Sequence, residues 1–524
     1  MIKMNSIFNK VCTLAVAALV ASCNLDTQPS DFVAPETFYR NESDCTMALA
    51  GVYSTLTEEA IYGSYYCGHL SNIDDLSYWF RQNLTNNIQN NSVNSSNNDL
   101  YNIWSKLYSG INNANVLLDK IDGANIDEKV KTRIKGEAKF LRAYYHFLLV
   151  QAFYEVPLRT ETVKDITISS QAATPHAEAI DWCISEMEEC LDMVDDSNYD
   201  RSPSHVKKNN IAGILARVYL WKAGVICNGG KEAYQKAGEY AKMVYNSRKH
   251  QLNPDVYTLW QNLACDKYDT QYNESLWEAE FIGSRDDGNY TNSRIGNELG
   301  NFQQNASSSG KGYSYGFYCS TLVLWDLFSE DDQRRDLSIA PYYLNAKDQM
   351  VEWKTTQLVD RRCGKYRREW ETTYPKHKNY TPYNYCILRY ADVLLMLAEA
   401  ENEVNQGPTA LAYECVNAIR TRAGIDEVSG LNYEGFKELV RDERARELCF
   451  ESTRKYDLVR WGIYYSRIKD VLGAAVKDSR WSTANYAKGC AQFVSNTEQK
   501  HIFMPIPMKE LSVNLLLEQN KYWK

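Results

Sequence analysis

The sequence predicts a mainly α-helical protein: tetratricopeptide-like helix pairs forming an α-solenoid scaffold, with a large irregular, loop-rich insertion that contains a few short strands. Apolar residues recur at helical spacing through residues 41–250 and again through 387–475, and this spacing marks one face of a helix. Between these parts, residues 251–386 have short apolar runs and many glycine, serine and asparagine residues, which is typical of loops. Residues 476–524 are expected to be a tail that packs on the scaffold.

The first 22 residues have the pattern of a signal peptide. Two lysines precede an apolar run at 11–20, which is about half the ~20 residues that cross a bilayer. The run ends in Leu19-Val20-Ala21-Ser22-Cys23, which resembles a bacterial lipobox. We therefore expect cleavage after residue 22 and lipidation of Cys23. An ordinary secretory signal with a chance cysteine is the alternative. Residues 23–40 are predicted to be a tether.

Residues 41–250 are predicted to contain six helices. The helix at 127–155 is apolar almost all round and is therefore expected to be central and buried. Alanines at positions 212 and 216 give the helix at 205–227 a flat side that a neighbour can approach. Asn41 or Ser43 can cap the first helix. The other helices are predicted at 41–59, 100–121, 176–194 and 231–247.

The insertion at 251–386 has weaker periodicity. Short strands are predicted at 276–282 and 364–367. Residues 283–318 form a long polar stretch that contains several aromatic side chains, and a loop of this length in a compact domain is usually functional or disordered. After the insertion, helices are predicted at 387–405, 408–423, 433–452 and 456–470, and a short one near 508–519.

The composition excludes several classes of function. With a formal net charge of −9, the protein has no electrostatic basis for binding nucleic acid. The fourteen cysteines form no CxxC pair, and several lie in apolar helical runs, so most are predicted to be core thiols and not disulfides. The seven histidines are scattered; we therefore expect no metal site, and the sequence indicates no cofactor.

Two aromatic groups are candidates for a binding surface. A sugar presents flat C–H faces and a rim of hydroxyls, so aromatic rings with nearby polar side chains suit it. The first group is Tyr78, Trp79 and Arg81, followed by an asparagine-rich run at 83–98 that we expect to be a surface loop. The second is Tyr290, Tyr313, Tyr315 and Tyr318 in the insertion. Each ring could instead anchor its own loop in the core. Trp104 and Trp325 lie at helical positions and are predicted to be core residues.

One segment has the form of a catalytic motif. Gly312-Tyr313-Ser314-Tyr315-Gly316 fits G-x-S-x-G, but a nucleophile elbow requires a strand before it and a helix after it. A polar loop precedes Gly312, so we interpret the segment as a tyrosine-rich binding loop. No catalytic residue is predicted.

Five blocks of sequence resemble one known family. They are LYSGINNAN at 107–115, FLRAYYHFLLVQAFYEVPL at 140–158, ILRYADVLLMLAEAENE at 387–403, RDERARELCFESTRKYDLVRWG at 441–462, and MPIPMKEL near the end of the chain. Together with the lipobox they resemble the SusD/RagB family of Bacteroidetes outer-membrane lipoproteins. The resemblance implies a tetratricopeptide-repeat protein that binds a nutrient, usually a glycan, and lies over a SusC-like TonB-dependent transporter. It also implies that the protein is not an enzyme.

The charged residues in these blocks are predicted to belong to the framework. They alternate in sign at helical spacing and can pair between neighbouring helices. Trp461 is expected to be a core ring beside them. The charged residues are Arg389, Asp392 and Glu399 in one block, and Arg444, Glu447, Arg454, Asp457 and Arg460 in the other.

The resulting expectation is an oligosaccharide-binding lipoprotein at the outer membrane that delivers its ligand to the transporter. An oligopeptide-binding protein of the same architecture, an outer-membrane glycoside hydrolase, and a repeat scaffold without a small ligand are alternatives. The resemblance places the ligand site in the two aromatic regions. Family members displayed at the cell surface tend to carry an acidic run after the lipidated cysteine. Here only Asp26 is acidic among the first residues after Cys23; surface display is expected, and a periplasm-facing anchor remains the alternative.

Overall fold

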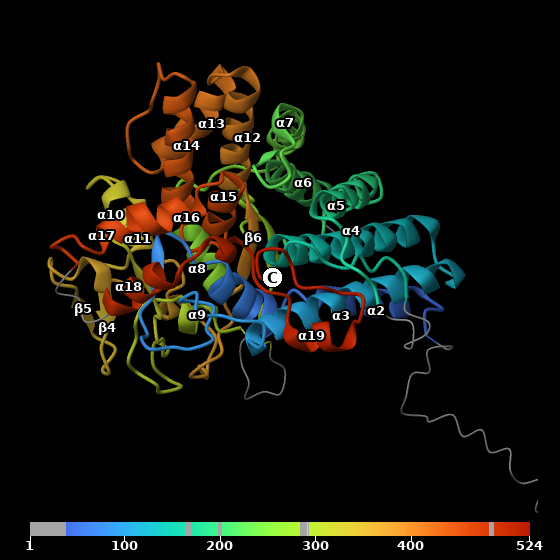
Figure 1. Ribbon diagram of the computed structural model, residues 1–524, viewed down its shortest axis with the longest axis horizontal. Coiled ribbons are helices and arrows are strands. Elements are labelled where there is room, and N and C mark those ends of the chain that lie inside the picture. Colours follow the sequence, from blue (N-terminus) through green and yellow to red (C-terminus); the bar gives the residue numbers. More distant parts are fainter. Residues whose placement is uncertain (1–37, 163–169, 197–201, 283–290, 292, 482–486) are drawn as a thin grey trace, which may run out of the picture.

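The computed structural model describes residues 38–162, 170–196, 202–282, 291, 293–481 and 487–524. Within these ranges the chain is mainly helical with a few short strands, as the sequence predicts. Figure 1 shows helices α2 to α5 on one side of the molecule, and β4, β5 and α18 on the opposite side.

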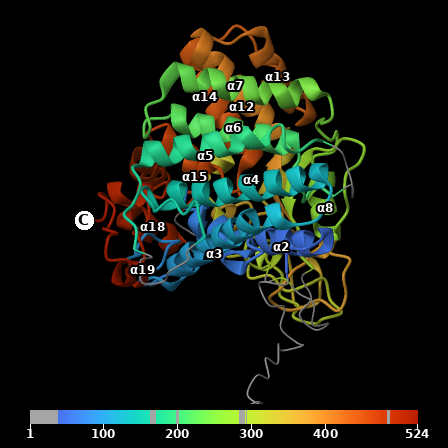
Figure 2. The ribbon, with the colours of Figure 1, turned by 90° about the vertical axis from the view of Figure 1, so that its right-hand side faces the viewer.

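The scaffold is a stack of antiparallel helices in which each helix packs on the one before it. Figure 2 shows the stack from α2 at one end to α7 near the other. The first part contains α2 (Glu42–Tyr53), α3 (Asn98–Lys120), α4 (Glu128–Phe153), α5 (His176–Cys190), α6 (Lys208–Ala223) and α7 (Gly230–Ser247). All six predicted helices are present, and α2 is capped by the Asn41 side chain, which accepts from the amide of Asp44.

The stack continues across the insertion. Helix α12 (Tyr390–Asn405) packs directly on α7, although the whole insertion separates them in sequence. Gly238 of α7 faces Ala400 of α12, and a Cβ on Gly238 would lie 3.4 Å from the Ala400 methyl group. Two further helices, α13 (Ala410–Arg422) and α14 (Tyr433–Leu448), pack on α12.

Helix α4 lies at the centre of the first part, as its apolar sequence predicts; nearly every side chain from Phe140 to Phe153 is buried. It packs against α3 at a glycine. A Cβ on Gly110 would lie 2.5 Å from Thr55 Oγ1 and 2.8 Å from the Tyr145 ring. A glycine inside a helix costs roughly 0.5–1 kcal/mol relative to alanine, and here it allows the close approach of α2, α3 and α4.

Three two-stranded antiparallel pairs involve the insertion, and β1, which precedes the insertion in the chain, joins one of them. Strand β1 (Ser77–Trp79) pairs with β3 (Tyr318–Ser320), β2 (Ser275–Ala279) with β6 (Tyr385–Arg389), and β4 (Tyr342–Leu344) with β5 (Met350–Glu352). The helices of this part are short: α8 (Thr258–Cys265), α9 (Ile295–Glu298), α10 (Leu322–Leu327) and α11 (Arg334–Ser338).

The strand predicted at 276–282 is present as β2, but the strand predicted at 364–367 is wrong. Only Arg362 and Cys363 form isolated bridges there. The chain then turns, because the Gly364 amide donates to the Ser338 carbonyl and Arg367 Nε donates back to the Gly364 carbonyl. A 3₁₀ turn follows at once.

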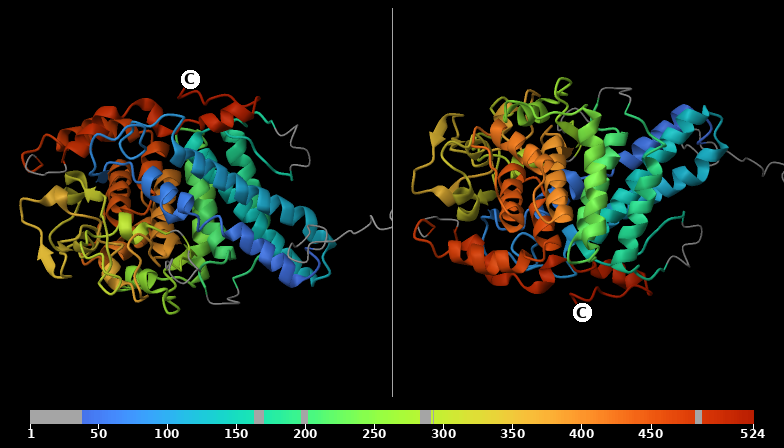
Figure 3. Two further views of the ribbon diagram at one scale, coloured as in Figure 1. Left: turned by 90° about the horizontal axis from the view of Figure 1, so that it is seen from below. Right: turned by 90° about the horizontal axis from the view of Figure 1, so that it is seen from above.

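The helix predicted at 456–470 is divided. Helix α15 (Arg454–Arg460) ends before Gly462, which has a φ of +74° and therefore takes a left-handed conformation that favours glycine. Helix α16 (Tyr464–Ser466) and a π-helical turn follow. The C-terminal tail holds α18 (Ala487–Asn496) and α19 (Met508–Val513) and runs along one long edge of the molecule (Figure 3).

The asparagine-rich run at 83–98 is not the purely solvated loop that its composition suggests. Ile88 and Val93 are buried, and several asparagine amides donate to backbone carbonyls of the same run. Asn91 reaches the tail, where its Nδ2 donates to Thr497 Oγ1 at 2.9 Å. Amide hydrogen bonds therefore supply much of the packing that apolar side chains would otherwise give.

The described part of the chain contains free cysteines and no candidate membrane-spanning helix. Twelve cysteines are free, and ten of these are buried, which confirms the prediction of core thiols. Among the helices of this part, none is long and apolar enough to span a membrane.

Candidate functional site

The charged residues of the blocks at 387–403 and 441–462 form a buried ion-pair network, as predicted. Arg444 joins Asp392 at 2.7 Å and Asp457 at 2.8 Å, and Arg460 donates to Glu399 at 2.7 Å. We use the name ion-pair network for the buried arginines 334, 389, 422, 444 and 460 with their carboxylate partners 392, 399, 443, 447, 451 and 457. These charges are matched within the protein, so the network serves the fold.

Of the three tryptophans predicted to be core residues, one is buried and two are only partly buried. Trp104 is 2% exposed and belongs to the core. Trp325 and Trp461 are only half-buried, so that prediction is wrong for them. Guanidinium groups cover their faces instead: Arg361 lies 4.7 Å from the Trp325 ring and Arg441 lies 5.0 Å from the Trp461 ring.

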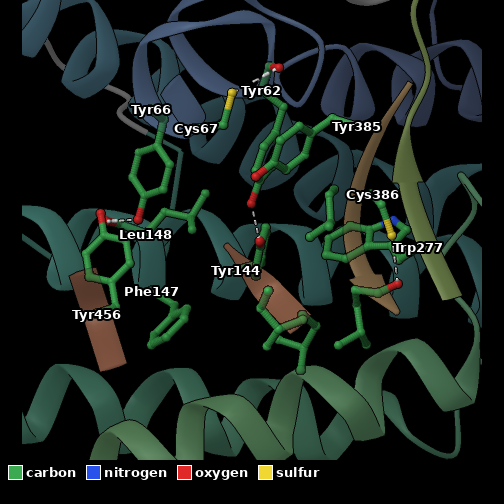
Figure 4. Close-up of a cluster of buried hydrophobic side chains, with 14 of the residues drawn as sticks. Tyr62, Tyr66, Cys67, Tyr144, Phe147, Leu148, Trp277, Tyr385, Cys386 and Tyr456 are labelled. Atoms are coloured by element: carbon green, nitrogen blue, oxygen red, sulfur yellow. Dashed lines mark hydrogen bonds between the residues drawn. The ribbon is translucent and has the colours of Figure 1, made fainter. Parts of the chain in front are cut away.

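A small cavity lies between the first and second parts of the scaffold. Figure 4 shows the tyrosines around it, among them Tyr62, Tyr66, Tyr144 and Tyr456. Its volume is about 50 Å³, which suits a few water molecules and not a sugar. The hydroxyls of Tyr62 and Tyr144 bond to each other, so this region is a polar core.

An open groove of about 730 Å³ lies beside α7, α12 and α13. Two of its polar side chains are engaged within the protein. The Tyr245 hydroxyl donates to Glu414, and Arg422 is bound to Glu274 at 2.8 Å.

The pairing of β1 with β3 brings the two predicted aromatic regions together. Trp79 lies opposite Tyr318 in the register of the two strands. The Trp79 ring packs against Phe317, with 4.2 Å between centroids. Two segments more than 200 residues apart in the sequence thus form one surface.

Three rings form a row on this surface, which we call the aromatic platform: Tyr313, Tyr315 and Phe317. Tyr315 stacks on Phe317 with centroids 4.8 Å apart and an interplanar angle of 6°. Tyr313 meets Tyr315 edge-on at 4.9 Å and 87°. Tyr313 and Tyr315 are half-buried and Phe317 is buried, so the two tyrosines present their exposed parts to solvent.

A cation lies at each end of the aromatic platform. The Arg81 guanidinium is 4.5 Å from the Phe317 ring and 5.9 Å from the Tyr315 ring. Lys378 Nζ is 4.9 Å from the Tyr313 ring. Both side chains are exposed. The site therefore combines flat apolar faces with hydrogen-bond donors, which is the combination that a sugar requires.

Two buried side chains hold the platform loop against the Lys378 loop. Asn297 Nδ2 donates to the carbonyls of Tyr313 and Lys378, at 3.1 and 3.0 Å. Arg368 Nη1 donates to the same two carbonyls, at 2.7 and 3.0 Å. Arg368 is itself fixed by Glu371, with Nε 2.9 Å from Oε1. The relative position of Tyr313 and Lys378 is thus set before any ligand arrives.

Three predicted site residues lie beneath the surface. Tyr78, Trp79 and Tyr318 are 2%, 7% and 1% exposed. The Tyr78 hydroxyl donates to the Val359 carbonyl at 2.7 Å, and the Tyr318 hydroxyl to the Gly68 carbonyl at 2.8 Å. In this position they support the strands that carry the platform.

Tyr290 and Cys23, the remaining predicted site residues, lie outside the described residues. Arg81, Tyr313 and Tyr315 are the predicted residues that the structure brings together at the surface. Phe317, Lys378, Asn297 and Arg368 are additional members that the sequence reasoning missed. The run Lys376-His377-Lys378, with tyrosines on both sides, was the available signal for Lys378.

Ser314 does not have the geometry of a nucleophile. It is fully buried, and its Oγ donates to the Asn297 carbonyl at 2.9 Å. Strand β3 follows the segment, where a nucleophile elbow would need a helix.

A Ser–His–Asp arrangement occurs in the core. His69 lies 3.4 Å from both Ser64 Oγ and Asp99 Oδ2. However, Ser64 is fully buried and donates to Glu298 at 2.6 Å. Burial would lower the pKa of His69, but the Glu298 and Asp99 carboxylates together outweigh it and raise the pKa to about 9. A protonated histidine cannot accept the serine proton at neutral pH, so this group is structural.

Two family models match this chain. The model described as "SusD family" matches residues 273–523, and the model described as "Starch-binding associating with outer membrane" matches residues 25–220. Together they cover the first part of the scaffold as far as residue 220, most of the insertion, the second part of the scaffold and the tail.

Individual proteins match along nearly the whole length. SusD-like protein P25 of Formosa agariphila is 27% identical over 534 aligned residues, covering 95% of this chain and 94% of that protein. A SusD homolog from Bacteroides thetaiotaomicron has a solved structure with a TM-score of 0.83 and 28% identity, covering 93% of this chain and 98% of the other. A structure described as a laminarin-binding SusD-like protein has a TM-score of 0.71 and 23% identity, covering 92% and 100%.

Proposed function

This chain belongs to the SusD family, and from that premise we propose that it is a non-catalytic glycan-binding protein that captures an oligosaccharide on the aromatic platform. The observation that carries the proposal is the row of Tyr313, Tyr315 and Phe317 with Arg81 and Lys378 at its ends. A relative of the same fold is described as laminarin-binding, which supports a sugar as the ligand.

The chemistry of the platform fits this role. A sugar ring can place its C–H face on the Tyr315 ring, and its hydroxyls can bond to the tyrosine hydroxyls, to Arg81 and to Lys378. The platform lies on loops carried by a rigid body, which is the usual arrangement of a binding site. Ser314 and His69, the two residues nearest to a catalytic arrangement, are engaged in the core, which supports binding without hydrolysis.

The direct test is calorimetry with a panel of neutral and acidic oligosaccharides, using wild type and a Tyr313→Ala/Tyr315→Ala double variant. We expect at least one glycan to bind the wild type, and the double variant to lose more than about tenfold in affinity, since well-packed aromatic anchors carry much of the binding energy. Tyr272→Ala, a half-buried tyrosine ahead of β2, is the matched control. Absence of binding across the panel, or an equal loss in the control, would contradict the proposal.

We further propose that Cys23 carries a lipid anchor, that the protein lies at the cell surface, and that it delivers its ligand to a SusC-like TonB-dependent transporter. The lipobox-like sequence before Cys23 and the family's association with the outer membrane support this. Cys23→Ala protein should leave the membrane fraction. Protease treatment of intact cells should degrade the wild type, and an antibody against it should co-purify a TonB-dependent barrel. Protection from protease would contradict the surface location and leave the proposed lipid anchor untested by that result.

A further inference from the structure

We propose that the ligand of the aromatic platform is an anionic glycan, one that carries uronate carboxylates or sulfate esters, and that Arg81 and Lys378 recognise the negative groups. The inference rests on the glycan binding proposed above and names the class of glycan. It comes from the charges around the platform and not from the relatives.

Arg81 and Lys378 are cations without a carboxylate partner among the described residues. Neither side chain has an acidic oxygen within 4.0 Å there, and both are exposed. Each lies against an aromatic ring, at 4.5 Å and 4.9 Å. The ring holds the charged group in place without neutralising it, so the positive charge stays available to a ligand.

The acidic side chains behind the platform are already engaged. Glu371 pairs with Arg368 at 2.9 Å. Glu369 accepts from the Tyr342 hydroxyl at 2.8 Å, and Asp348 accepts from Asn305 at 2.7 Å. These carboxylates cannot turn to Arg81 or Lys378 without breaking such bonds.

Two further lysines add positive charge to the same edge. Lys376 is 5% exposed, and its Nζ donates to the backbone carbonyls of Lys311 and Arg368, at 3.0 and 2.8 Å. Lys311 is exposed, and no ion pair links it to a carboxylate of the described residues. The carboxylates of Glu371, Glu369 and Asp348 act on buried Lys376, so the charge left for a ligand at this edge is that of Arg81, Lys378 and Lys311. A ligand carboxylate or sulfate gains a charge-assisted hydrogen bond from such cations.

The platform is also a local exception in an acidic protein. The chain has a formal net charge of −9, and its long-range field repels anions. An anionic ligand therefore needs a patch where the sign is reversed. The row of rings with a cation at each end supplies that patch, and the brace by Asn297 and Arg368 keeps Lys378 beside Tyr313.

Matched ligands test the inference by calorimetry at low salt. Oligogalacturonate is compared with its methyl ester, which keeps the sugar and removes the charge, and a sulfated galactan oligosaccharide is compared with its desulfated form. We expect the charged member of at least one pair to bind about tenfold or more tightly. The advantage should shrink at about 1 M salt, where exposed charges are screened. The pair that shows the effect identifies carboxylate or sulfate as the source.

Charge-neutralising variants locate the effect. Arg81→Gln and Lys378→Gln should each weaken the charged ligand by about three- to tenfold and leave any neutral ligand unchanged. Lys129→Gln, an exposed lysine on the first turn of α4, should change neither.

If neutral members bind as well as charged ones, and the double tyrosine variant still abolishes binding, the anionic class is overturned while glycan binding stands. If no glycan binds, neutral or charged, both proposals fall.

Discussion

The ion-pair network and the aromatic platform place the same residue types under opposite conditions. In the network, buried Arg389 reaches three glutamates: Glu451 at 2.6 Å, Glu447 at 2.6 Å and Glu274 at 3.3 Å. At the platform, exposed Arg81 reaches rings and no carboxylate of the described residues. A buried charge needs an opposite charge within the protein, because its removal from water costs free energy. An exposed charge stays hydrated and needs no partner within the protein.

The difference teaches how to distinguish framework charge from binding charge in this molecule. Framework arginines are buried and carry several carboxylates each. The two cations proposed to bind ligand, Arg81 and Lys378, are exposed and lie on rings of the aromatic platform, and the Asn297 amide also holds the Lys378 carbonyl. The following experiments test that distinction, from the largest expected effect to the smallest.

Arg389→Met should destabilise the protein strongly. The substitution leaves Glu447 and Glu451 in the core with one cation fewer, and breaking a buried pair typically costs about 3–5 kcal/mol. Urea unfolding followed by circular dichroism measures the loss. Arg480→Met is the control, because Arg480 pairs with Asp326 and Asp478 in solvent and its removal should leave the unfolding midpoint unchanged. A stable Arg389→Met protein would contradict the structural role of the network.

Acid should unfold the protein through its paired aspartates. Burial would raise the pKa of Asp75, but Arg454 and Arg467 outweigh it and lower the pKa to about 2; Arg444 and Arg217 do the same for Asp392. Since both folded-state values lie below the ordinary value of 3.8, the stabilisation is present above about pH 4 and is lost as the pH falls toward 2.

Urea midpoints between pH 2 and 7 measure this loss. Asp75→Asn should be less stable than wild type at pH 7, and the two curves should converge near pH 2. Parallel curves would show that Asp75 does not titrate in this window. Arg81→Gln should leave the acid profile unchanged, since Arg81 holds no carboxylate of the described residues.

Asn297→Ala should weaken glycan binding indirectly, since Asn297 holds the loops of the aromatic platform and of Lys378 and is not itself expected to contact the glycan. The carbonyls of Tyr313 and Lys378 lose one donor but keep Arg368, so the free energy of unfolding should fall by only about 1 kcal/mol. Calorimetry should show an affinity loss of several-fold because Lys378 is no longer fixed beside the platform. Unchanged affinity with reduced stability would show that the brace serves the fold alone.

Arg81→Gln should have the smallest effect on stability, about 0.5 kcal/mol or less, because the side chain is exposed and its contacts with the described residues are to aromatic rings. The same denaturation measurement applies. If Arg81→Gln lowered the free energy of unfolding as much as Arg389→Met, the proposed distinction between framework arginines and platform cations would be contradicted.

Much of the fold could be predicted from the sequence because helical periodicity is a local signal. The first six scaffold helices and the buried position of α4 follow from it directly. The breaks were harder to predict. The end of α15 depends on the left-handed Gly462, and the turn at Gly364 depends on a hydrogen bond to Ser338, far away in the sequence.

The candidate site could be predicted only in part, because its parts come from three distant segments. The sequence indicated Arg81, Tyr313 and Tyr315, since aromatic and polar residues gather there. It could not show that β1 pairs with β3, which decides that Tyr78 and Tyr318 point into the core. Lys378 is held at the site by the carbonyl contacts of Asn297 and Arg368 and by the Tyr313 ring, and these contacts cannot be inferred from composition.

The return of the chain to α7 sets an order of events during biogenesis. Helix α7 is made before the insertion, but its small-residue face around Gly238 is covered only when α12 arrives. Domains generally fold as units as they are synthesised, yet this face must stay open until the whole of 251–386 has been produced. Until α12 has been made, the face of α7 around Gly238 therefore lacks the helix that covers it in the folded protein.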